Sequence, residues 1–105
     1  MSEEIQGYEE LMTKYYGEEC VTAMVLLKVE SRELDNTANE LIKLKNVEDI
    51  FLVTGDTDII FKAKFGNYGE LKEFVHKLAD IPGLKESKTL LVVTTYKENG
   101  KPKPL

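Results

Sequence analysis

Two carboxylates and two hydroxyl groups lie between Thr54 and Asp58, in the segment Val53-Thr54-Gly55-Asp56-Thr57-Asp58. Side chains of these types commonly satisfy the backbone groups of a tight turn, and that interpretation needs no ligand. They can also receive a small charged molecule, because carboxylates bind ammonium groups and exposed turn N–H groups bind anions. Two carboxylates and two hydroxyls fall short of a defined oxygen cage, so we expect no metal ion here.

Groups suited to catalysis are scarce in the rest of the chain. There is one histidine, His76, and one cysteine, Cys20, and the two are far apart in the sequence. No paired-cysteine, zinc-protease, dinucleotide, phosphate-loop or serine-hydrolase motif is present. We therefore expect no catalytic residue and no cofactor.

The charge balance argues against a nucleic-acid binder. The formal net charge is −5, and Arg32 is the sole arginine. Nucleic-acid interfaces usually carry a basic stripe and use arginine for phosphates and bases. No apolar run approaches the roughly 20 residues of a membrane helix. One cysteine cannot form an internal disulfide, so we expect a cytoplasmic protein. From the charge balance and the short apolar runs we expect no specific binding to nucleic acid and no binding to membranes.

Hydrophobic spacing predicts the elements that must position the turn. Apolar residues at helical spacing predict an acidic helical extension in residues 1–19, a helix capped by Ser31 and closed by Asn46, and a second helix around Leu71 to Ala79. Alternating or continuous apolar runs predict four strands, over 20–30, 48–54, 58–65 and 87–97. The Gly55-Asp56 pair predicts a hairpin between the middle strands. The domain then spans residues 20–97, followed by a flexible tail at 98–105.

This order of elements predicts an α+β fold of the ferredoxin-like βαββαβ type. Right-handed crossovers would place both helices on one face of a four-stranded antiparallel sheet. The opposite face would present five apolar side chains, namely Met24, Leu26, Ile60, Leu90 and Val92. Because burying each stabilises by about 1.5–3 kcal/mol, we expect a homodimer through this open face. The alternative is that the N-terminal helix folds across it.

The turn and two later segments resemble a known family. Val53-Thr54-Gly55-Asp56-Thr57-Asp58, then Ile81-Pro82-Gly83-Leu84 and Thr89-Leu90-Leu91-Val92, are similar to the effector-binding (RAM) domain of the Lrp/AsnC, or feast/famine, transcription regulators. The resemblance covers about residues 20–97. It implies the same fold, sheet-to-sheet dimers, and assembly of dimers into octameric or decameric rings. Full-length members add an N-terminal helix-turn-helix domain, so this chain resembles a stand-alone effector domain.

The resemblance also implies the ligand and its site. In the family, free amino acids bind between neighbouring dimers. Carried over, one wall of the site is Gly55, Asp56, Thr57 and Asp58, and the other is Leu78 and Ala79 of an adjacent subunit. The position of Thr57 is often aromatic in the family, so this chain lacks a stacking surface there.

The expected function is therefore non-catalytic amino-acid sensing and oligomerisation linked to transcription regulation. Hetero-association with full-length regulators is a further partnership that a shared dimer face would allow. Two alternatives stay open: a ligand-free scaffold for partner assembly, and a small dimeric ferredoxin-like enzyme.

Overall fold

Strict alternation of apolar residues builds the two central strands. The computed structural model describes residues 20–104, so the helix expected in residues 1–19 lies outside the described part. β1 (Val21–Val29) and β3 (Ile59–Phe65) run antiparallel, with Val21 opposite Phe65 and Leu27 opposite Ile59. Every second residue of both strands is buried on the same face, as the period of two requires.

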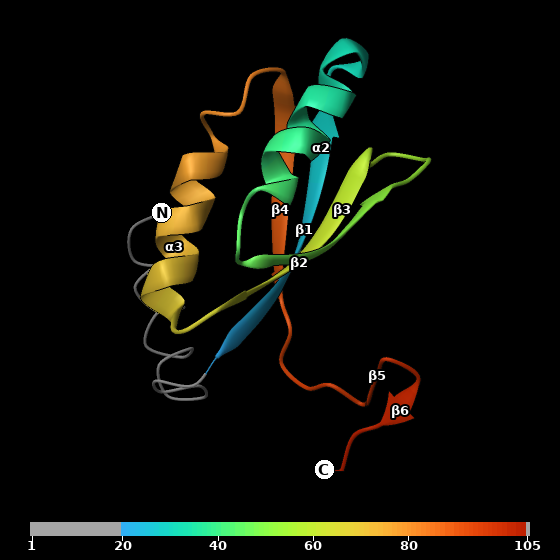
Figure 1. The fold of residues 1–105 in the computed structure, drawn as a ribbon, viewed down its shortest axis with the longest axis vertical. Coiled ribbons are helices and arrows are strands. Elements are labelled where there is room, and N and C mark those ends of the chain that lie inside the picture. The colour runs from blue at the N-terminus through green and yellow to red at the C-terminus, as the bar shows by residue number, and fades with distance from the viewer. Residues whose placement is uncertain (1–19, 105) are drawn as a thin grey trace.

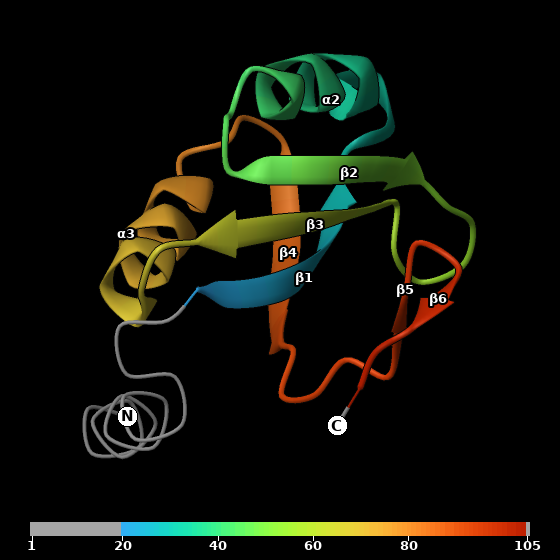
Figure 2. The same ribbon diagram turned by 60° about the horizontal axis from the view of Figure 1, so that its bottom comes forward.

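β2 (Val47–Leu52) and β4 (Leu84–Leu91) complete the sheet at its two edges. The strand order is β2-β3-β1-β4, and all neighbouring strands are antiparallel (Figures 1 and 2). This confirms the predicted ferredoxin-like α+β fold.

The helices cover one face of the sheet. A short 3-10 turn, η1 (Ser31–Glu33), leads into α2 (Leu34–Ile42), and α3 (Tyr68–Leu78) follows β3. The prediction that Ser31 caps the first helix is wrong: Ser31 lies inside the 3-10 turn, and no side chain caps it. None of the helices within residues 20–104 is long and apolar enough to cross a membrane.

The start of α3 comes from a cap that the apolar pattern alone does not reveal. The Asn67 side-chain oxygen accepts a hydrogen bond from the Glu70 N–H at 3.0 Å, and the Glu70 carboxylate accepts one from the Gly66 N–H at 2.7 Å. Such reciprocal bonds satisfy N–H groups that a helix start leaves without partners. The helix therefore begins at Tyr68, before the first residue of its apolar stripe.

The core lies between the sheet and the helices. Phe74 of α3 packs edge-on against Phe61 and Phe65 of β3, with ring centroids 5.9 and 5.1 Å apart. Leu41 of α2 is fully buried against the same layer. These contacts hold both helices on the face that carries the alternating buried residues of β1 and β3.

The last strand is shorter than predicted, and the tail differs from the expected flexible end. β4 stops at Leu91, opposite Ala23, and one further bond joins the Val92 N–H to the Thr22 carbonyl. The chain then leaves the sheet, although β1 extends to Val21. Residues 97–102 then form a hairpin, β5 (Lys97–Glu98) with β6 (Lys101–Pro102). Its turn is Asn99-Gly100, and both residues have positive φ.

One carboxylate joins this hairpin to the open face of the sheet. Glu98 accepts a hydrogen bond from the Lys62 ammonium at 2.6 Å and pairs with Lys103 at 3.3 Å. These cations lower the pKa of Glu98 to about 2. The ion pairs explain why the tail takes a definite place beside β3.

Candidate functional site

The turn between β2 and β3 is a six-residue loop closed by a backbone bond. The Val53 N–H donates to the Asp58 carbonyl at 2.8 Å, so the predicted hairpin is present with a longer loop than Gly55-Asp56 alone. Gly55 has φ +111°, a conformation that side chains rarely adopt. Asp56 is exposed, and Thr57 and Asp58 are half-buried.

The Asp58 side chain belongs to the fold. Its carboxylate accepts a hydrogen bond from the Val29 N–H at 2.9 Å, and its own N–H donates to the Leu27 carbonyl at 2.9 Å. The Leu27 carbonyl and the Val29 N–H are two residues apart on β1, so both point toward the adjacent strand, β3. The carboxylate therefore continues the β1–β3 ladder by one bond where β3 has not yet begun.

A small polar cavity lies beside the turn, on the side of the sheet away from the helices. Its volume is about 340 Å³, and Asp56 and Thr57 form its edge. The rest of its lining comes from neighbouring strands: Leu26, Leu27 and Lys28 of β1, and Glu86 and Lys88 of β4. The turn thus faces charged groups of both signs.

Strand pairing explains how these groups meet. Leu26 is opposite Lys88, and Lys28 is opposite Glu86. These positions alternate with buried residues of β1, so their side chains share the open face. The sequence analysis missed Lys28, Glu86 and Lys88, because only the register of β1 against β4 brings them beside the turn. The arrangement presents two ammonium groups and two carboxylates around the apolar Leu26.

The second predicted wall lies elsewhere in the chain. Leu78 is buried and lines a different cavity, between α2 and α3, while Ala79 is exposed at the C-terminal end of α3. Both ribbon views place α3 and the β2–β3 turn on opposite sides of the molecule (Figures 1 and 2). A single chain does not bring Leu78 and Ala79 to the Gly55–Asp58 turn.

The open face of the sheet is apolar along its centre. Register places four of the five predicted residues, Met24, Leu26, Ile60 and Leu90, on this face, and Val92 follows it opposite Thr22. Phe51 of β2, which the sequence analysis missed, pairs with Ile60 and is 54% exposed. Leu90 is 48% exposed. Large apolar side chains are thus left partly exposed on this face.

Side chains that could bind a metal ion do not cluster in the described part of the chain. Within residues 20–104, no group of three or more histidine, cysteine or acidic side chains could hold a metal ion. Cys20 and His76 are both exposed.

Comparison with known proteins gives one consistent result. Residues 22–102 match the family model described as the Lrp/AsnC ligand binding domain. The HTH-type transcriptional regulator FL11 of Pyrococcus abyssi is 32% identical over 76 residues, which are 72% of this chain and 50% of that protein. The chain therefore spans about half the length of this relative.

Solved structures agree on the fold. The crystal structure of FFRP-DM1 superposes with a TM-score of 0.67 at 22% identity, and the match covers 70% of this chain and 99% of that one. The transcriptional regulator NMB0573 of Neisseria meningitidis, solved as a complex with L-Met, gives a TM-score of 0.70 at 21% identity, over 78% of this chain and 56% of that one.

Proposed function

The chain belongs to the Lrp/AsnC ligand-binding domain family, and from that premise we propose that it is an amino-acid-sensing and assembly module of transcription regulation. The relatives with this domain are transcriptional regulators, and the module is not an enzyme. The observation that carries the proposal is the cavity beside Asp56, which combines lysines, carboxylates and an apolar side chain.

This cavity suits a free amino acid. The ligand carboxylate would pair with Lys28 or Lys88, and its ammonium group with Asp56 or Glu86. Leu26 would contact an apolar ligand side chain. The complex of NMB0573 with L-Met supports this class of ligand, since that regulator shares the fold. Within the turn, Gly55 and Asp58 would shape the wall while Asp56 and Thr57 contact the ligand.

The site would be completed by a neighbouring dimer. Ala79 is exposed at the end of α3, with Leu78 buried directly before it, and in the same chain both lie away from the turn. A second subunit that brings its Ala79 against Asp56 would close the cavity from outside. Amino-acid binding would then be coupled to the assembly of dimers into octameric or decameric rings.

The homodimer itself would form through the open face. Phe51 and Leu90 lie there about half exposed, beside Met24, Leu26 and Ile60. The same face would allow hetero-association with full-length regulators of the family. In such a mixed assembly the partner would read the DNA sequence and this module would supply the effector response in the cytoplasm.

A thermal-shift screen of the twenty amino acids tests the proposal. A ligand that binds only the native state raises the melting temperature, by an amount equivalent to about 2.7 kcal/mol at a hundredfold excess over Kd. We expect one or a few amino acids to do so in the parent chain and to lose the effect in Asp56→Ala. Asp35→Ala, at an exposed position on α2 outside the cavity, is the matched control.

The alternative is a ligand-free assembly scaffold, and the role of Asp58 in the β1–β3 ladder favours it. If no amino acid shifts the melting temperature of the parent chain while the dimer persists in sedimentation, the scaffold holds and amino-acid sensing is refuted.

A further inference from the structure

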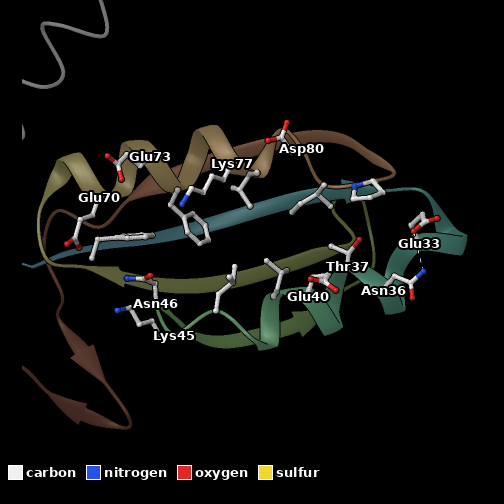
Figure 3. Close-up of a pocket in the computed structure, with 17 residues that line it drawn as sticks. Glu33, Asn36, Thr37, Glu40, Lys45, Asn46, Glu70, Glu73, Lys77 and Asp80 are labelled. Carbon is white, nitrogen blue, oxygen red and sulfur yellow. Dashed lines mark hydrogen bonds between the residues drawn. The ribbon is translucent and has the colours of Figure 1, made fainter.

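A groove of about 800 Å³ runs between α2 and α3 (Figure 3). It lies on the face of the sheet opposite to the small polar cavity beside Asp56. Its floor is apolar and consists of Leu41, Leu44, Phe65, Phe74, Leu78 and Ile81. Leu41, Phe65 and Leu78 belong to the buried core, but Leu44 is 39% exposed. The floor therefore rests on the packed core, and at Leu44 it has apolar surface that the described part of the chain leaves in contact with solvent.

The borders of the groove are acidic. Glu33 and Glu40 lie on the side of α2, and Glu70, Glu73 and Asp80 lie on the side of α3 (Figure 3). Two lysines, Lys45 and Lys77, are the basic residues among those that line it. Five carboxylates against two ammonium groups make a negative border around an apolar floor, and that combination selects the charge of any occupant.

The chain's own segments have the wrong charge or the wrong place. Residues 1–19 contain six glutamates and one lysine, so the same border would repel them. A second copy that presented its own helix face would bring five more carboxylates against these five. The lysine-rich C-terminal tail is held beside β3 on the other face by the bond between Glu98 and Lys62.

We propose that this groove is a docking site for a basic amphipathic helix of a partner protein. An apolar stripe at positions i, i+3, i+4 and i+7 would enter the floor, and lysine or arginine side chains on both flanks would meet the acidic borders. α3 has eleven residues, roughly 16 Å at 1.5 Å per residue, so a partner helix of about three turns spans the groove. Within one chain this surface is separate from the cavity beside Asp56 and from the open face, but its lining residues Leu78 and Asp80 flank Ala79, so a neighbouring dimer seated on Ala79 would lie at one end of the groove.

Binding of two designed peptides to the full chain tests the proposal. One is a capped, fluorescein-labelled helix of about 14 residues with leucine along one stripe and lysine elsewhere, and the other replaces every lysine with glutamate. We expect measurable binding of the lysine peptide by fluorescence anisotropy, weakening with added salt, and at least tenfold weaker binding of the glutamate peptide. Equal binding of both peptides would overturn the charge argument.

Two matched double variants locate the binding. Glu73→Lys with Asp80→Lys reverses two exposed border charges, and Asp35→Lys with Asp49→Lys makes the same change in net charge at exposed positions outside the groove. The first pair should weaken binding of the lysine peptide at least tenfold, and the second should change it less than threefold. Similar losses in both would mean nonspecific attraction and would refute the groove.

A third variant tests the floor without disturbing the core. Leu44→Asn removes apolar surface at a side chain that is already 39% exposed, so the fold should persist while peptide binding weakens. Backbone amide shifts on adding the lysine peptide should fall on Thr37, Leu44 and Phe74. Shifts confined to the open face of the sheet, or a peptide of residues 1–19 that binds as well as the lysine peptide, would each overturn the proposal.

Discussion

Replacing Asp58 with alanine should lower the stability of the fold, whereas the same replacement of Asp56 should leave it nearly unchanged. The two residues share one turn, but the Asp58 carboxylate accepts a hydrogen bond from the Val29 N–H at 2.9 Å. Asp56 is exposed, and within residues 20–104 no hydrogen bond or ion pair to its side chain is found. The comparison separates a structural aspartate from one that is free to bind a ligand.

The size of the effect follows from the group left behind. Val29 is 3% exposed, so removing the carboxylate leaves a buried N–H without its acceptor. A hydrogen bond to a charged group contributes about 1.5–3 kcal/mol. For a domain of this size each kcal/mol shifts the melting temperature by roughly 4–8 °C, so we expect Asp58→Ala to lower it by about 6–24 °C. Asp56→Ala should stay within about 0.5 kcal/mol of the parent chain.

Calorimetry and denaturant melts at pH 7 measure both variants, and titration of the amino acid found in the screen measures their binding. Asp58→Asn, which keeps one acceptor oxygen, should recover part of the stability lost in Asp58→Ala. A melting temperature of Asp58→Ala within about 2 °C of the parent would refute the structural role of this carboxylate. Loss of stability in Asp56→Ala would refute the inference that Asp58 is structural and that Asp56 is free to bind a ligand.

Three other predictions concern the tail, the open face and a glycine. The pKa of Glu98 is lowered from 4.5 to about 2, chiefly by Lys62, so the unfolded chain takes up this proton first as the pH falls. The stabilisation from the ionised carboxylate is therefore complete above pH 4.5 and is lost toward pH 2. Melts at pH 5 and pH 2 should show that Glu98→Gln loses less stability between these two pH values than the parent chain does. Ile60→Asp places a charge at the centre of the open face and should give monomer or unfolded chain in sedimentation velocity; a dimer of parental stability would contradict the interface. Gly83 has φ +80°, and an added Cβ would lie 2.6 Å from the Glu33 Cγ. Gly83→Ala should therefore lower the free energy of unfolding by about 1–3 kcal/mol, measured by denaturant melts. An unchanged denaturation midpoint would contradict this prediction.

Much of the fold was predictable because burial has a local signature. Alternate residues of β1 and β3 are apolar, and the structure buries those same residues. The helical stripes around Leu41 and Leu78 likewise identify the sides that face the core. Since a strand has a period of two and a helix of about 3.6, each side chain's face can be read from spacing alone.

Element ends were less predictable from apolar spacing, because they depend on polar contacts and on partners. The Asn67 cap sets the start of α3, and β4 ends at Leu91 although the apolar run continues to Val93. The Asn99-Gly100 pair is a local hairpin signal that the sequence analysis did not use. The place of that hairpin, however, depends on Lys62, which lies 36 residues away in the sequence.

The candidate site divides in the same way. The sequence by itself determined that Gly55–Asp58 is a charged turn and that the family's ligand-binding module surrounds it. Only the tertiary structure decided that the Asp58 carboxylate accepts a hydrogen bond from the Val29 N–H. It also decided that Asp56 shares a cavity with Lys28 and Lys88, and that an acidic groove lies beside Leu78. The physical reason is that spacing along the chain decides which face a side chain occupies, whereas its neighbours on that face depend on strand register and on how far apart the helices pack, and both are long-range properties of the folded chain.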